Sequence, residues 1–101
     1  MWNTILQDLK DNPRDIQTAP LRGSGIWFYA ESDGKKVIIS KSKSHAPSVN
    51  INGHRTLNSA QYEKMLKIYL RRKQGEQVSG EAAQSTFNQV YWYGLFNAFG
   101  L

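Results

Sequence analysis

Residues 26–40 read IWFYAESDGKKVIIS, and they carry the clearest structural signal in the chain. Two runs of β-branched and aromatic residues, 26–31 and 35–40, flank the pair Asp33-Gly34. Such a pair between two such runs is typical of a β-hairpin, because glycine adopts the backbone angles of a tight turn. Both runs are apolar at consecutive positions. We therefore expect one face of the hairpin on the core and the N-terminal helix over part of the other.

A short helix is expected before the hairpin, over residues 2–11. Four apolar side chains recur at the spacing i, i+3, i+4 and i+7, which places them on one stripe. They are Trp2, Ile5, Leu6 and Leu9. The pair Asn12-Pro13 ends the helix, because proline disfavours helical geometry in the residue before it. Residues 13–25 contain two prolines and two glycines and are interpreted as an irregular connector.

The chain beyond the hairpin predicts a strand and then helices. Val49 and Ile51 alternate with asparagines, which indicates a short third strand before the turn Asn52-Gly53. A helix follows from Asn58 or Ser59 to Lys73, with Asn58 as its cap. Its expected buried stripe is Tyr62, Met65, Leu66, Tyr69 and Leu70.

The last helical segment is expected from about residue 81 to residue 99. Its first apolar stripe is Phe87, Val90, Tyr91, Gly94, Leu95 and Ala98, and its second is Trp92, Phe96 and Phe99. The predicted fold is therefore α+β in a single domain, 1–101. It consists of an N-terminal helix, a small antiparallel sheet built on the hairpin with a short third strand, and two C-terminal helices.

The central part of the chain is strongly basic. Residues 35–73 hold ten of the thirteen lysines and arginines and one acid, Glu63, whereas the whole chain carries a net charge of +5. Such segregated charge is typical of a surface that meets a polyanion, so we predict nucleic-acid binding, with duplex DNA favoured over RNA. The predicted phosphate contacts are Lys41, Lys43, Arg55, Lys64, Lys67, Arg71, Arg72 and Lys73.

Ordinary structural reasons for some of these residues stay open. Lys41 and Lys43 alternate with serines, a pattern that also protects an exposed edge strand. Cations at a helix C-terminus are favoured by the helix dipole alone. Trp27, Phe28 and Tyr29 lie beside lysines and could stack on bases, although such residues commonly belong to a core.

The segment from Leu57 to Leu95 has the order of elements of a helix-turn-helix unit. A helix with a basic end is followed by Gly75, then by VSGEAA at 78–83 and STFNQVYWY at 85–93. This pattern resembles the resolvase and homeodomain-like helix-turn-helix class. The resemblance implies a recognition helix whose polar residues face the major groove, where Asn and Gln suit adenine edges. Those residues are Ser85, Thr86, Asn88 and Gln89. An ordinary helical hairpin, or one helix over 81–99, fits the same residues.

A second hypothesis is a small protein–protein adaptor or inhibitor, such as a phage or mobile-element factor. Its basic face would cover an acidic surface of a larger protein. Aromatic residues dominate the binding energy of many interfaces, so the C-terminal helix would provide the anchors, also toward a second copy in a homodimer. These anchors are Trp92, Phe96 and Phe99.

Enzyme activity and membrane insertion are not expected. The chain has no cysteine, no signal-peptide pattern and no apolar run of the roughly 20 residues that cross a bilayer, which indicates a cytoplasmic protein. His45 and His54 with Glu31 or Asp33 could form a metal-dependent nuclease site, but they lack the usual number and spacing of ligands. No cofactor motif is present, so no cofactor or metal is expected.

Overall fold

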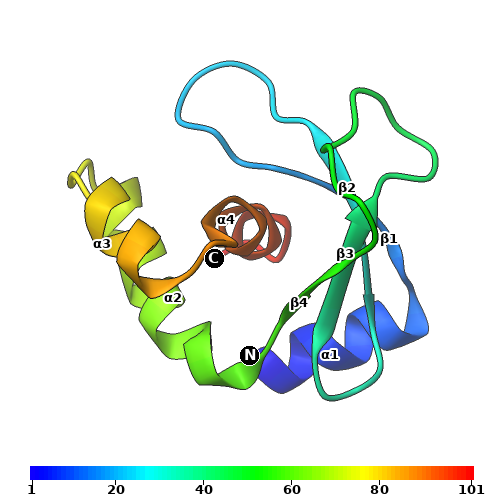
Figure 1. Ribbon diagram of the computed structural model, residues 1–101. Helices are drawn as coiled ribbons and strands as arrows, with labels where there is room; N and C mark the ends of the chain where they lie inside the picture. Colours follow the sequence, from blue (N-terminus) through cyan, green and yellow to red (C-terminus); the bar gives the residue numbers. More distant parts are fainter.

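The computed structural model describes residues 1–101, which form four helices and four strands (Figure 1). In chain order the elements are α1 (Trp2–Asp11), β1 (Arg14–Gln17), β2 (Trp27–Ser32), β3 (Val37–Lys41), β4 (Arg55–Leu57), α2 (Ser59–Lys73), α3 (Ser79–Ser85) and α4 (Gln89–Ala98). The predicted α+β class is confirmed. No helix has the length and apolar character that a membrane span requires.

The sheet has the order β1-β2-β3-β4, and every neighbouring pair is antiparallel. β2 and β3 form the predicted hairpin, and Gly34 in its turn has φ of 91°. The Asp33 carboxylate accepts hydrogen bonds from the backbone N–H groups of Lys35 and Lys36, which lower its pKa to about 2. The Asp-Gly signal therefore identified both the hairpin and its turn.

Two predictions about strands were wrong. The connector expected over 13–25 contains β1, which pairs with β2 and buries Ile16. Val49 and Ile51 do not form a strand but are buried in a loop. The remaining strand, β4, follows the Asn52-Gly53 turn. This loop crosses the start of β2, where Val49 N–H donates to the carbonyl oxygen of Trp27 at 2.8 Å. The alternation of Val49 and Ile51 therefore reflects burial in a loop that is attached to β2 by one isolated bridge, between Ser48 and Trp27.

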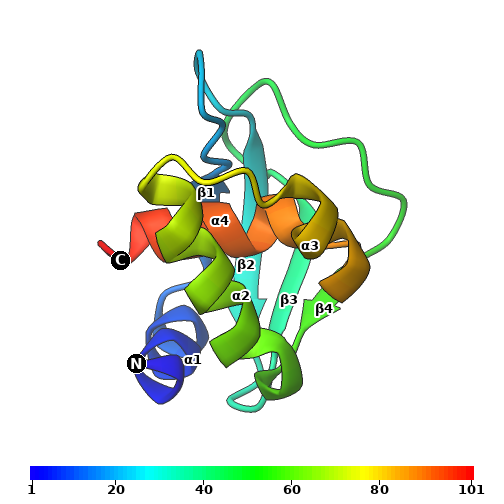
Figure 2. The ribbon, with the colours of Figure 1, turned by 90° about the vertical axis from the view of Figure 1, so that its left-hand side faces the viewer.

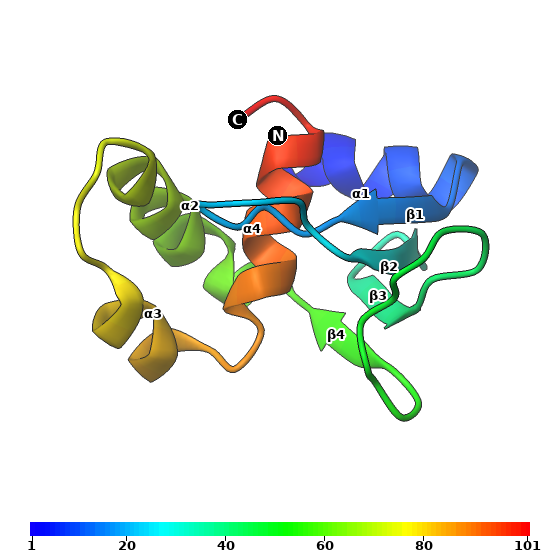
Figure 3. The same ribbon diagram turned by 90° about the horizontal axis from the view of Figure 1, so that it is seen from above.

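All four helices lie on one side of the sheet (Figures 1 and 3). α4 lies between the sheet and α2. Phe28 and Ala30 of β2 point into the core that the helices cover. The buried residues of α1, among them Ile5 and Leu9, belong to the same core. The prediction that α1 covers the other face was therefore wrong. That face, here called the outer face, carries Trp27, Tyr29 and Glu31 of β2.

The predicted helix over 59–73 is confirmed as α2, and the Asn58 side chain caps it by accepting from Ala60 N–H. Its buried stripe differs at one turn from the prediction. Ile68 is buried, whereas Leu70 is 43% exposed. α2 lies against α4 (Figure 2). Ile68 is on the side of α2 that packs into the core, whereas Leu70 is on the side that faces solvent.

The chain after α2 forms two helices, α3 and α4, instead of one. Thr86 is extended, with φ of −162°, and its hydroxyl accepts from Asn88 N–H, which separates the helices. Phe87 lies in this break and is 89% exposed, so its expected place in a buried stripe was wrong. α4 passes so close to β1 that a Cβ on Gly94 would lie 2.8 Å from the carbonyl oxygen of Gln17. Only glycine permits this approach.

Candidate functional site

The eight predicted phosphate-contact residues do not form one face. Lys43 follows β3 and lies beside the outer face of the sheet, whereas Lys41 is the exposed last residue of β3 and pairs with the core-facing Phe28. Lys64 and Lys67 lie on the exposed side of α2, beyond α4 from the sheet (Figure 3). Arg55 lies on β4 and donates to Asn88 Oδ1 at 3.3 Å. The basic segment of the sequence is therefore divided between two sides of the molecule.

The three cations at the end of α2 have partners within the chain. Arg71 forms ion pairs with Glu76 at 2.7 Å and with Glu81 at 2.8 Å, and these hydrogen bonds raise its pKa. Arg72 donates to the carbonyl oxygen of Ala19, and its guanidinium lies over the ring of Tyr93. Lys73 donates to the main-chain oxygen of Leu101 at 2.8 Å. These residues stabilise the fold where a phosphate surface was expected.

The four predicted base contacts lie at the junction of α3 and α4 and do not share one exposed helix face. Thr86 is buried, and the Ser85 hydroxyl donates to the carbonyl oxygen of Glu81. Asn88 accepts from Arg55. Gln89 begins α4, but residues 91–96 of that helix are all buried. A recognition helix presents its base-reading residues on one exposed face, and these four residues do not lie on one helix, so base contact by them stays a prediction.

The predicted interface anchors are also placed differently. Trp92 and Phe96 are fully buried, and their ring centroids are 5.5 Å apart. Trp92 packs on Trp2 of α1, whereas the ring of Phe96 meets Tyr62 of α2. Phe99 is partly buried against the same core. These aromatic residues join the helices within one chain, so the adaptor hypothesis loses its proposed anchors.

The outer face of the sheet brings together aromatic and cationic side chains that are distant in the sequence. The imidazole of His45 stacks on Trp27, with ring centroids 3.9 Å apart and an interplanar angle of 18°. The ammonium of Lys43 lies 4.4 Å from the ring centroid of Tyr29. We call Trp27, Tyr29, Lys43 and His45 the aromatic–cation cluster. Its two aromatic rings alternate with the buried Phe28 and Ala30, which places them outside the core.

Asp15 of β1 holds the loop that carries half of this cluster. Its carboxylate accepts from the backbone N–H groups of Lys43, Ser44 and His45 at 2.8 to 3.0 Å, and it contacts His45 Nδ1 at 2.8 Å. The side chain is only 2% exposed. Burial alone would raise the pKa of Asp15, but the hydrogen bonds from His45 and from the three N–H groups outweigh it, and the pKa is lowered.

The histidines do not meet the acids that the nuclease hypothesis paired with them. His45 is bound to Asp15, while Asp33 stabilises the hairpin turn and pairs with Lys36 at 3.3 Å. No group of three or more His, Asp or Glu side chains is arranged to hold a metal ion. The expected grouping of His45 and His54 with Glu31 or Asp33 is thus not formed.

Sequence reasoning missed Asp15, and it considered the two outer aromatic residues only as a weaker alternative. The partners of Asp15 are 28 to 30 positions away, so no local pattern links them. For Trp27 and Tyr29 a signal was present, because alternate side chains of a strand point to opposite faces and Phe28 lies between these two. Comparisons with protein-family models, with curated proteins and with solved structures found no match to this chain.

Proposed function

We propose that the protein binds single-stranded nucleic acid across the outer face of its sheet. The observation that supports this proposal is the aromatic–cation cluster, in which Trp27 and Tyr29 lie outside the core beside Lys43 and His45. Single strands are bound by aromatic rings that stack on bases and by cations that contact phosphates. A cytoplasmic location, expected from the sequence, belongs to the same proposal.

The cluster supplies both kinds of contact. One face of the His45 ring lies on Trp27 and the side chain is 49% exposed, so a base stacked on the imidazole would extend an existing stack. Trp27 and Tyr29 are two positions apart on one strand, which separates them by about 6.7 Å. Lys43 keeps its ammonium beside Tyr29, close to where the phosphate of a bound nucleotide would lie.

A single strand fits this surface better than the duplex favoured by the charge of the sequence. The helix that would have entered a groove is buried, and the cations of α2 lie on the far side of α4. Lys43 remains on the outer face for phosphate contact. One neutralised phosphate gives a slope of log affinity against log salt of about −0.7 on a single strand.

The test is fluorescence anisotropy with single-stranded DNA and RNA of about ten nucleotides, the scale of known single-strand sites. His45→Ala should weaken binding about fivefold or more, because a stacked base contributes on the order of 1–3 kcal/mol. Lys43→Ala should weaken binding because it removes the phosphate contact. Lys43→Ala should also reduce the salt slope by about 0.7.

The matched control is Lys67→Ala, which removes the same charge from the exposed side of α2. It should leave both the affinity and the salt slope nearly unchanged. Equal losses from Lys43→Ala and Lys67→Ala would mean that binding follows net charge alone, and the proposed surface would be rejected. Absence of salt-sensitive binding to any strand would reject the function itself.

A further inference from the structure

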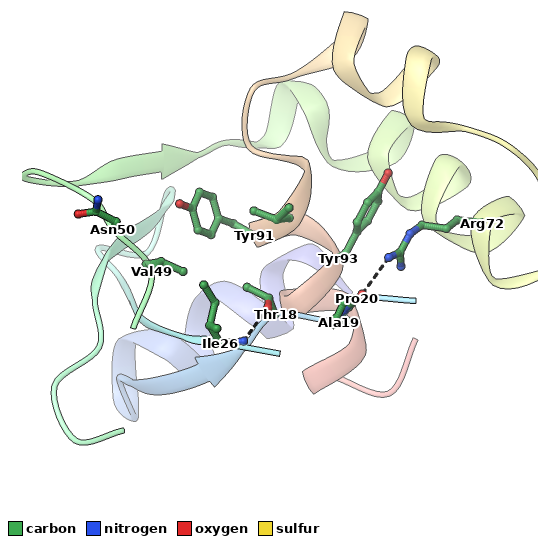
Figure 4. A pocket seen from close by; sticks show the side chains of 10 residues that line it. Thr18, Ala19, Pro20, Ile26, Val49, Asn50, Arg72, Tyr91 and Tyr93 are labelled. Atoms are coloured by element: carbon green, nitrogen blue, oxygen red, sulfur yellow. Dashed lines mark hydrogen bonds between the residues drawn. The ribbon is translucent and has the colours of Figure 1, made fainter. Parts of the chain in front are cut away.

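A pocket of about 330 Å³ opens on the side of α4 (Figure 4). It is formed by the chain before β2, the loop after β3, the first turns of α4 and one residue of α2. The lining residues are Thr18, Ala19, Pro20, Ile26, Val49, Asn50, Arg72, Val90, Tyr91 and Tyr93. None of them belongs to the aromatic–cation cluster. The pocket volume lies at the lower end of the range of about 300–1,000 Å³ for small-molecule sites.

Apolar side chains at the opening of the pocket are exposed to water. Ile26 is 39% exposed and Val90 is 49% exposed, and both line the hollow. Single exposed apolar residues are common on protein surfaces, but a concave group of them is typical of a binding site. Val49 continues the same apolar wall and is buried. A ligand with an apolar body would cover these side chains.

Arg72 gives the pocket a positive end. Its guanidinium lies 4.4 Å from the ring centroid of Tyr93 and donates one hydrogen bond, of 2.9 Å, to the carbonyl oxygen of Ala19. No acid is among the lining residues, and Arg72 forms no ion pair. Its neighbour Arg71, in contrast, is paired with both Glu76 and Glu81. Arg72 is therefore held in place and has N–H groups left for an anion.

We propose that this pocket binds a small molecule with an apolar body and one anionic group, a carboxylate or a sulfonate. The apolar body contacts Ile26, Val49 and Val90. The anionic group accepts hydrogen bonds from Arg72, whose planar guanidinium suits two oxygens at once. The stacking on Tyr93 fixes the guanidinium before the ligand arrives, so little side-chain freedom is lost on binding.

The experiment compares two probes that share an apolar ring system. The anionic probe is 1-anilinonaphthalene-8-sulfonate, and the neutral one is N-phenyl-1-naphthylamine, which lacks the sulfonate. Each is titrated against the folded full chain by fluorescence, and amide chemical shifts locate the bound probe. Arg72→Met removes the cation, whereas Val90→Trp fills the pocket from an exposed position on α4. Lys67→Met is the matched loss of a cation elsewhere on α2.

The expected result is saturable one-to-one binding of the anionic probe, with shifts at Ile26, Val49 and Val90. Arg72→Met should weaken this probe about tenfold, the effect of losing roughly one charge-assisted hydrogen bond, and leave the neutral probe nearly unchanged. Val90→Trp should abolish binding of both probes, and Lys67→Met should affect neither.

Three results would overturn the proposal. These are no saturable binding of the anionic probe by the wild type, equal weakening by Arg72→Met and Lys67→Met, and full binding of both probes by Val90→Trp. Arg72→Met could loosen the chain around Ala19, which accepts from Arg72. Val90 is exposed, so Val90→Trp should keep the fold, and that variant then decides. Binding of nucleic acid by the aromatic–cation cluster is independent of all three results.

Discussion

Replacing Asp15 by Asn should release the loop that carries Lys43 and His45. The carboxylate has two acceptor oxygens, and together they serve three backbone N–H groups. An amide keeps one oxygen. If that oxygen stays with Ser44 and His45, the amide NH₂ group faces the N–H of Lys43, which then loses its acceptor.

The magnitude follows from these bonds. One lost backbone hydrogen bond destabilises by about 1 kcal/mol, and each of the two remaining backbone bonds weakens by about 0.5 kcal/mol because its acceptor is no longer ionised. Asp15→Asn should therefore lower the free energy of unfolding by about 2 kcal/mol. By the same energy, amide hydrogen exchange at Lys43, Ser44 and His45 should become about 30-fold faster.

The assay is urea unfolding together with amide exchange, carried out at several pH values. The folded pKa of Asp15 is below its ordinary value of 3.8, so its stabilisation is fully present above about pH 4 and is lost as the pH falls through the folded pKa. The difference between wild type and Asp15→Asn should therefore shrink in acid.

Asp11→Asn is the control, because the Asp11 carboxylate accepts only from the side chain of Gln7 on an exposed turn of α1. It should change stability by less than about 0.5 kcal/mol, as is usual at the surface. The reasoning is refuted if Asp15→Asn matches this control, or if its effect is the same at pH 7 as at the acid end.

Two further predictions concern the packing of α4. Gly94→Ala should destabilise by about 1–3 kcal/mol despite the better helix propensity of alanine, because the new Cβ would lie 2.8 Å from Gln17 O and 2.9 Å from Phe28 Cε1. Gly80→Ala in α3 meets nothing within 4 Å and should stabilise by about 0.5 kcal/mol when both variants are compared by urea unfolding. Trp92→Ala should cost about 3–5 kcal/mol by urea unfolding. Trp92→Phe should cost clearly less, because Trp92 Nε1 donates to no other group of the chain. Equal costs would contradict this explanation.

The elements predicted correctly are those with local signals. The hairpin has an Asp-Gly turn between two β-rich runs, α1 has a regular apolar stripe, and α2 has the cap Asn58. Such signals need only neighbours within a few positions, so a single sequence is sufficient to read them. β1 has no such local signal, because a strand of four residues with one buried side chain, Ile16, shows no alternation of apolar and polar residues.

The break between α3 and α4 was hidden by composition. Residues 81–99 contain no proline, and the apolar residues around Trp92 suit a helix on every side, so periodicity could not mark the turn at Thr86. The helix is apolar on most of its circumference because it contacts the sheet, α1 and α2 together. This central position explains why the C-terminal aromatic residues are core and why no recognition helix is exposed.

Charge along a chain differs from charge in space when consecutive elements lie in different layers. The basic segment begins on the hairpin and ends on α2, and α4, which comes last in the sequence, separates the two (Figure 3). Counting lysines therefore overestimates the cations that one strand of nucleic acid could reach. The alternation of β2 is a better guide, because it assigns Trp27 and Tyr29 to the face opposite Phe28 before any contact is known. The surface that we propose for binding is an aromatic pair on the face that no helix covers, with Lys43 held beside it through Asp15, and neither composition nor net charge could locate it.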